Sequence, residues 1–257
     1  MVKNIGGSCI KDDTLIIMLK HYNNINKNDN INTDLPKEQI IKELEERFGE
    51  RQNEWVKNKV FQNLPDEITE ELLYYTFKPN GPQGKFTWLS TVDLEYAMKQ
   101  YKIKHPDFKF LGAVPIDFAE LIGLDINNIN FDEEKRNGNK RFGVIFNLDE
   151  HYKGGSHWVS LFFDLDKKQI YFSDSVGKKP VKRIKEYIDK IINYMGKNVD
   201  YQYNKMEHQK GNSECGVYSI NWILRLLNGK TFEHLTSKRL SDEDVNKCRL
   251  RYFNTNK

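Results

Sequence analysis

The apolar and polar positions along the second half of the chain predict a layer of short strands and one buried helix. Apolar and aromatic residues dominate or alternate along 141–147, 157–165 and 169–174, which is typical of strands in a sheet. Residues 217–227 are apolar on almost every face and are followed by Asn228-Gly229, a common helix end. A helix of this kind belongs in the interior of a domain. We therefore expect an α+β fold with this helix at its centre.

The segments around these elements predict the rest of the domain. The turn at 166–168 joins two of the strands and indicates an antiparallel hairpin, so we expect a mostly antiparallel sheet. Ser90 with Asp93 approximates a capping box at the start of a helix. Residues 127–140 are polar and predict a surface loop. Further strands are expected at 110–114 and 199–203, and helices at 90–101, 116–123 and 181–195.

The first 80 residues differ from the remainder. Apolar residues with helical spacing predict helices at 13–22 and 36–48, and further helical patterns surround Trp55 and Ile68. Residues 78–85 contain two Pro and two Gly, which marks a break. We expect an N-terminal helical arm at 1–80 and a core domain at 81–257. The arm carries no catalytic motif, and it is either a docking element for a substrate or scaffold or a helical extension packed on the core.

Composition narrows the class of protein. The 257 residues are 30% charged and have a mean hydropathy of −0.73, and no apolar run is long enough to span a bilayer. The net charge of +3 divides unevenly, because residues 1–80 hold 11 basic and 14 acidic residues and the remainder holds 29 and 23. The three cysteines form no CxxC pair, so we expect neither disulfides nor a zinc site, and no other cofactor. We expect a protein that is not secreted and works in a reducing compartment, cytoplasmic or nuclear if it is cellular.

Cys215 is the candidate nucleophile. It opens the predicted central helix, where unpaired backbone N–H groups favour a thiolate over a thiol. Gly216 leaves space beside the sulfur. The alternative is that Cys215 is a buried cysteine that only fills space, as most lone cysteines do.

Three other residues are the partners that thiol chemistry needs. Gln209 stands six residues before Cys215, close enough for its amide to donate a hydrogen bond to an oxyanion beside the sulfur. His157 begins one strand of the hairpin and Asp174 ends the other, so the register brings them together. His208 is the strongest rival to His157, but it lacks a strand partner that would fix its tautomer.

These residues, in this order, resemble the SUMO-protease superfamily of cysteine proteases. The matching positions are His157-Trp158, Asp174-Ser175, Gln209 and Cys215-Gly216. The resemblance implies a core related to papain-like cysteine proteases. It also implies that Cys215 attacks the substrate, that His157 transfers the proton and is oriented by Asp174, and that Gln209 stabilises the oxyanion.

The resemblance extends to substrate binding. Trp88 precedes a predicted helix, as in the first motif of these proteases, although Ser90 and Thr91 replace the usual Asn-Asp. In relatives, tryptophans at the positions of Trp88 and Trp158 form a narrow tunnel that only glycine can pass. The resemblance thus implies cleavage after Gly-Gly-like sequences. The alternative is that both tryptophans are ordinary core residues that do not contact the substrate.

The sequence is compatible with several substrates and activities. The chain looks most similar to maturation proteases of large DNA viruses, which implies processing of structural polyproteins in the virion and host cytoplasm. The main alternative is a cellular or bacterial protease that removes SUMO or other ubiquitin-like modifiers. An acetyltransferase using the same triad with acyl-CoA is a further alternative, and a catalytically dead module that binds a ubiquitin-like partner is a third.

Weak nucleic-acid binding is a separate prediction. Viral relatives of the adenovirus type use DNA as an activator, and the helix at 181–195 has a basic exposed face. An ordinary solvated helix face has the same composition. The residues concerned are Lys178, Lys179, Lys182 and Arg183.

Overall fold

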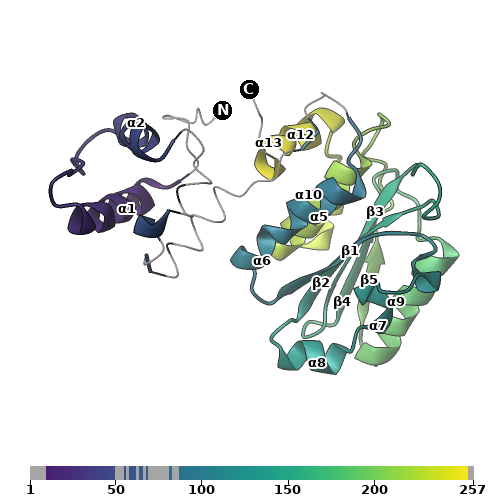
Figure 1. Cartoon of the computed structure of the whole chain (residues 1–257). Coiled ribbons are helices and arrows are strands. Elements are labelled where there is room, and N and C mark those ends of the chain that lie inside the picture. Colours follow the sequence, from purple (N-terminus) through teal and green to yellow (C-terminus); the bar gives the residue numbers. More distant parts are fainter. Residues whose placement is uncertain are drawn as a thin grey trace. The chain divides into compact units, whose positions relative to one another are not determined.

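A computed structural model gives the arrangement of the chain and describes residues 10–49, 55, 58–61, 64–65, 68, 81–82 and 87–253 (Figure 1). The chain divides into two compact units, Met1–Lys78 and Pro79–Lys257. Separate clusters of buried apolar side chains lie within the two units, so each has an interior of its own.

The N-terminal unit is helical in its described part. Helix α1 (Asp12–Ile25) and helix α2 (Lys37–Phe48) are followed by the short 3-10 helix η1 (Lys59–Phe61). The predicted helices at 13–22 and 36–48 are confirmed, while most of the pattern around Trp55 and Ile68 lies outside the described residues. The buried residues of this unit include Leu15, Leu19, Ile40, Ile41, Leu44 and Trp55.

A five-stranded sheet with the order β1-β2-β3-β4-β5 forms the base of the C-terminal unit. The pairs β2/β3 and β3/β4 are antiparallel, whereas β1/β2 and β4/β5 are parallel. The prediction of a mostly antiparallel sheet is therefore wrong, because helical segments cross over between the two outer pairs. The strands are β1 (Phe108–Pro115), β2 (Arg141–Asn147), β3 (Trp158–Asp164), β4 (Gln169–Ser173) and β5 (Asp200–Tyr203).

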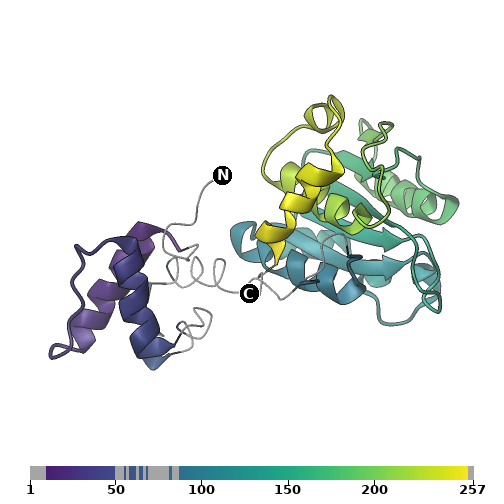
Figure 2. The ribbon, with the colours of Figure 1, turned by 90° about the horizontal axis from the view of Figure 1, so that it is seen from above.

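Helices cover both faces of this sheet. Helix α5 packs on β1 and helix α10 on β3, with the C-terminal helices α12 and α13 beside them, and α9 covers the opposite face (Figures 1 and 2). All seven residues of β3 are buried in consequence. The helices of the described part of this unit are α5 (Thr91–Lys99), α6 (Tyr101–Lys104), η2 (Phe118–Glu120), α7 (Asp125–Asn128), α8 (Phe131–Arg136), α9 (Lys182–Met195), α10 (Cys215–Leu227), α11 (Phe232–Thr236), α12 (Asp242–Lys247) and α13 (Arg249–Tyr252).

Two local expectations have opposite outcomes. The capping box of α5 is present, because Ser90 Oγ accepts the N–H of Asp93 and the Asp93 carboxylate accepts the N–H of Ser90. The loop expected at 127–140 is wrong, since this stretch contains the end of α7 and all of α8. Asn130 caps α8, and the ring of Phe131 is buried in the hydrophobic core of the C-terminal unit.

Candidate active site

Cys215 is the first residue of α10 and is only 1% exposed. The first N–H groups of a helix have no partner within the helix, so the sulfur lies at the positive end of a helix of 13 residues. Gly216 allows a close approach there, because a Cβ atom at this position would lie 3.1 Å from Cβ of Leu89. The start of helix α10 therefore packs closely on Leu89, in the segment that precedes α5.

His157 and Asp174 form a hydrogen bond between His157 Nε2 and Asp174 Oδ1, with a distance of 2.7 Å. The antiparallel pair of Ser160 with Ser173 sets this geometry. If that register is continued, His157 and Asp174 are diagonal neighbours on one face of the hairpin. The expected hydrogen bond is thus present. Asp174 is 2% exposed, and its Oδ1 also accepts the N–H of Val176 at 3.0 Å.

The imidazole of His157 lies between Asp174 and Cys215. Burial lowers the pKa of His157, but hydrogen bonds with Asp174 and Cys215 outweigh this effect and raise the pKa to about 9. Because Nε2 faces Asp174, the Nδ1 atom is left for the sulfur. At neutral pH the ring is therefore a cation held between a carboxylate and a thiol group. This is the setting in which a cysteine becomes nucleophilic.

The side chain of Gln209 is held at both ends of its amide. Its Oε1 accepts the hydroxyl of Ser175 at 2.6 Å, and its Nε2 donates to the carbonyl of Gly211 at 3.0 Å. A backbone carbonyl only accepts, so the contact with Gly211 fixes which end of the amide is nitrogen. The –NH₂ group carries two hydrogens, and this contact uses one of them. The other remains to donate to an oxyanion.

Trp88 and Trp158 line one cavity of about 440 Å³. Trp158 is 5% exposed and donates its Nε1 hydrogen to the carbonyl of Leu89 at 2.9 Å, whereas Trp88 is 43% exposed. Both indoles therefore line the same cavity. The ring of Trp158 is buried and held by a hydrogen bond, whereas the ring of Trp88 is open to solvent. The cavity is also lined by Ser90, Thr91, Ala113, Pro115, Asn147, Asp149, Glu150, His151, Lys153, Gly154 and Gly155.

Two other histidines, His208 and His151, have polar partners of their own. His208 is fully buried, and its Nδ1 accepts the N–H of Leu240 at 2.9 Å, so it is held as a neutral ring against Trp222. Burial lowers the pKa of His208. His151 pairs with Asp117 at 2.6 Å in the wall of the cavity.

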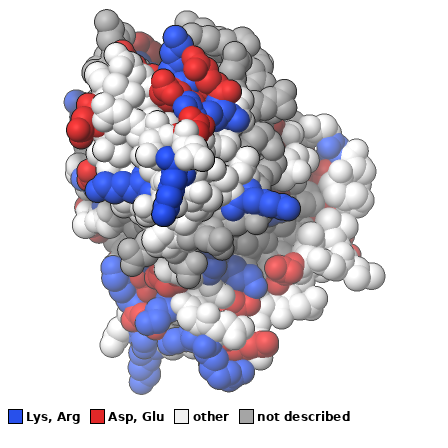
Figure 3. Space-filling view, turned by 60° about the vertical axis from the view of Figure 1, so that its left-hand side comes forward, with Lys and Arg blue, Asp and Glu red and all other residues white. Residues whose placement is uncertain are grey.

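The basic residues at the start of α9 are mixed with acidic ones. Arg183 lies 2.8 Å from Glu120 and 3.9 Å from Glu150, and Lys182 lies 3.9 Å from Glu186. The face drawn in Figure 3 carries both basic and acidic side chains. Nucleic-acid binding by Lys178, Lys179, Lys182 and Arg183 stays a prediction without support.

Among residues 10–49, 81–82 and 87–253 and the few described between them, no group of three His, Cys, Asp or Glu side chains is placed to hold a metal ion. None of the helices in the described part of the chain combines the length and apolar character needed to cross a bilayer.

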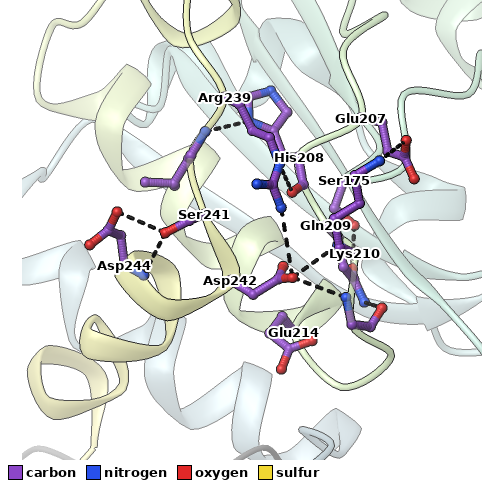
Figure 4. A network of polar contacts seen from close by, with 12 residues as sticks. Ser175, Glu207, His208, Gln209, Lys210, Glu214, Arg239, Ser241, Asp242 and Asp244 are labelled. Carbon is purple, nitrogen blue, oxygen red and sulfur yellow. Dashed lines mark hydrogen bonds and ion pairs between the residues drawn. The ribbon is translucent and has the colours of Figure 1, made fainter.

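Contacts from the C-terminal segment were not predicted from the sequence. Arg249 of α13 donates from Nη2 to the carbonyls of Thr87 at 2.6 Å and Ser213 at 3.3 Å, which joins the chain before Trp88 to the loop before Cys215. Asp242 contacts the same loop (Figure 4). No local pattern reports such contacts, because the partners are more than 30 residues apart.

The chain is similar to several known proteins. Residues 143–257 match the C-terminal catalytic domain of the Ulp1 protease family. R355 of Acanthamoeba polyphaga mimivirus, named as a thiol protease, is 35% identical over 268 residues, which are 96% of this chain and 89% of its own length. S273R of African swine fever virus, named a cysteine protease and in other isolates a SUMO-1 cysteine protease, is 28% identical over 69% of this chain and 71% of its own length. The crystal structure of the pS273R protease of that virus has the same fold, with a TM-score of 0.65 and 20% identity over 100% of this chain and 94% of that one.

Proposed function

Because the chain belongs to the Ulp1 protease family, whose members are cysteine proteases, we propose that it hydrolyses peptide bonds with Cys215 as nucleophile and His157 as proton carrier. The observation that carries this assignment is the position of the His157 ring. The ring forms a hydrogen bond with the buried carboxylate of Asp174, and its interactions with Asp174 and with Cys215, the first residue of α10, raise its pKa to about 9. Membership of this family favours hydrolysis over the acyl-CoA-dependent alternative.

The chemistry follows from these positions. The thiolate of Cys215 attacks the carbonyl carbon of the scissile bond, and the carbonyl oxygen becomes an oxyanion. The free amide hydrogen of Gln209 and the backbone N–H at the start of α10 stabilise that charge. His157 then gives its proton to the leaving amine, and the acyl group stays on the sulfur. A water molecule, deprotonated by His157, hydrolyses the thioester and restores the thiolate.

Asp174 has a supporting role in this scheme. Its contact with Nε2 of His157 holds the ring in one orientation and favours the protonated form. The carboxylate itself keeps its charge throughout, as in other triads.

The proposed substrate is a protein with a Gly-Gly-type sequence before the cut, and specifically a viral structural polyprotein processed during virion maturation. The shared cavity of Trp88 and Trp158 supports the sequence preference, since flat rings leave room for a backbone but not for side chains. The viral origin of the mimivirus and African swine fever virus relatives supports the polyprotein.

Removal of SUMO or another ubiquitin-like modifier is the second candidate. The observation that favours it is the name SUMO-1 cysteine protease carried by a relative. The two candidates differ in what precedes the diglycine. A deconjugating protease needs a folded modifier there, whereas a maturation protease accepts an extended chain.

Peptides and a folded substrate together test the proposal. We expect Gly-Gly-X peptides to be cleaved at least about tenfold better than Gly-Leu-X peptides, because a tight site rejects added carbon atoms. Trp88→Ala should reduce this preference for Gly-Gly-X over Gly-Leu-X, because the variant lacks the ring that would exclude the leucine side chain. Efficient cleavage of Gly-Leu-X by the wild type would contradict the glycine requirement. A ubiquitin-like protein fused through Gly-Gly to a reporter serves as the comparison, and a strong preference for it over the peptide would favour deconjugation.

A further inference from the structure

The loop that carries Gln209 is held by residues that follow about 30 positions later in the chain. Four hydrogen bonds join residues 239–242, which end at the first residue of α12, to residues 208–211 (Figure 4). Two of them precede Gln209 in the loop and two follow it. The backbone is therefore fixed on both sides of the proposed oxyanion donor.

On the N-terminal side, the partner is His208. Nε of Arg239 donates to the carbonyl of His208 at 2.8 Å, and the N–H of Leu240 donates to His208 Nδ1 at 2.9 Å. The peptide that enters Gln209 is thereby tied to the segment 239–240 through its carbonyl and through the ring.

On the C-terminal side, the partner is Asp242. Its Oδ2 accepts the N–H groups of Lys210 at 2.9 Å and Gly211 at 3.0 Å. Hydrogen bonds to a carboxylate are stronger than those between neutral groups. The Asp242 side chain is 20% exposed, and its two partners in the loop are exposed residues.

The effect of Asp242 reaches the amide of Gln209 through Gly211. The carbonyl of Gly211 accepts the Gln209 Nε2 hydrogen at 3.0 Å, so the orientation of that amide depends on where the Gly211 peptide lies. Ser175 holds only the oxygen end of the amide. Without Asp242 the nitrogen end would lose the fixed position of its acceptor.

The carboxylate also contacts the helix of the nucleophile. The hydroxyl of Tyr218, in the first turn of α10, lies 3.0 Å from Asp242 Oδ1 and 2.9 Å from the carbonyl of Leu240. The segment 239–242 thus contacts the loop and the helix that meet at Cys215.

We propose that Asp242 is a positioning residue that, with Arg239, holds Gln209 in the orientation needed to stabilise the oxyanion; this rests on the proposed function of Gln209. An oxyanion donor contributes to the transition state and not to the thiolate. Loss of Asp242 should therefore lower kcat and leave both KM and the reactivity of Cys215 unchanged.

A double-mutant cycle on the full-length protein tests this role. Removing one oxyanion donor lowers kcat by about 10²–10³-fold, and we expect Asp242→Ala to lower it by about tenfold or more. In the Gln209→Ala background, Asp242→Ala should change kcat little further, because the group that it positions is gone. The rate of Cys215 alkylation by iodoacetamide should stay at the wild-type value in every variant.

Conservative and matched variants separate positioning from general stability. Asp242→Asn keeps an oxygen that accepts both N–H groups and should restore most of kcat. Asp244→Ala is the matched control, because Asp244 lies in the same first turn of α12 but pairs with Ser241 and Lys247 instead of the loop. It should retain wild-type kcat.

Each result decides the question. Unchanged kcat in Asp242→Ala, or losses that multiply fully with those of Gln209→Ala, would overturn the positioning role while the proposed function stands. Wild-type kcat in Gln209→Ala would overturn both. If Asp242→Ala does not fold, Arg239→Met, compared with Lys238→Met, tests the other side of the loop by the same assays. We expect Arg239→Met to lower kcat and Lys238→Met to leave it unchanged. Equal kcat values in these two variants would overturn the proposed positioning of Gln209.

Discussion

The hydroxyl of Ser175 donates to Oε1 of Gln209 at 2.6 Å, while its neighbour Asp174 accepts from His157 at 2.7 Å. Two consecutive residues that directly follow β4 therefore orient the proposed proton carrier and the proposed oxyanion donor. The carbonyl of Ser175 adds to this by accepting the N–H groups of His208 and Gln209.

This relationship predicts the effect of Ser175→Ala. The oxygen end of the Gln209 amide would lose its only side-chain hydrogen-bond donor in the described residues, so the amide would reorient. We expect kcat to fall by about tenfold, less than the roughly 10²–10³-fold expected for Gln209→Ala, with KM little changed. Steady-state kinetics on a Gly-Gly-X peptide measure both values. A double mutant as slow as Gln209→Ala alone would confirm that Ser175 acts through Gln209, and a much slower one would show an independent role.

The nucleophile assignment predicts that Cys215→Ala removes hydrolysis while the fold is kept. The loss should exceed about 10⁴-fold, as for removal of other catalytic nucleophiles. Cys248→Ala is the matched control, because Cys248 is a partly exposed free cysteine on the same unit. Peptide mapping after limited alkylation should find Cys215 modified ahead of Cys248 and Cys9. Turnover that survives in Cys215→Ala would end the protease assignment.

The raised pKa of His157 predicts an alkaline limit to activity. The pKa is about 9 against an ordinary 6.5, so the cationic ring is fully present below pH 6.5 and is lost as the pH rises through about 9. Any stability that the charged ring contributes follows the same window. We expect kcat/KM to decline with a midpoint of about 9. In Asp174→Asn the midpoint should move to lower pH, because the carboxylate raises the pKa of the ring. A pH–rate profile that is identical in the two proteins would contradict this account.

Arg249 predicts a stability effect that Arg251 does not share. Arg249→Met removes hydrogen bonds to two carbonyls, those of Thr87 and Ser213, and we expect unfolding to become easier by about 1–3 kcal/mol. Activity should fall as well, since these carbonyls flank Trp88 and Cys215. Arg251→Met, at an exposed position of the same helix, should change the free energy of unfolding by less than about 0.5 kcal/mol. Chemical denaturation of both variants provides the comparison.

The N-terminal arm predicts a difference between substrates. Its net negative charge and its lack of catalytic motifs suggest docking, so a chain that begins near Gly81 should cleave peptides at wild-type rates but lose efficiency on a folded protein substrate. The ratio of the two kcat/KM values is the measurement. Equal losses on both substrates would show instead that the arm stabilises the core.

The sequence predicted the parts of the site that depend on local pattern. Alternation in two strands and a short turn were enough to place His157 near Asp174, and the apolar character of 217–227 was enough to place Cys215 at a helix start. The short helices within 125–136 were missed, because only Ile126 and Phe131 are buried there. Polar residues outnumber them, and the N-cap at Asn130 was the signal to use.

The parallel strand pairs were predictable in principle. A helix at 181–195 lies between the strands at 169–174 and 199–203, and two strands joined through a helix on one face of the sheet are parallel. The contacts of Asp242 and Arg249 were not predictable, because a carboxylate or guanidinium in a polar stretch has no pattern that names a partner over 30 residues away.

The hydrogen bonds from residues 239–249 to the loop before Cys215 join parts of the chain that leave the ribosome at different times. A nascent chain that ends at Leu227 already contains Cys215, His157, Asp174 and Gln209, but it lacks Asp242 and Arg249. Domains fold as units during synthesis, and this one lacks the hydrogen bonds of Asp242 and Arg249 to the loop until its last helices are made. Unfinished chains should therefore be weak proteases. Such a delay would protect neighbouring proteins, and the nascent enzyme itself, from cleavage during translation.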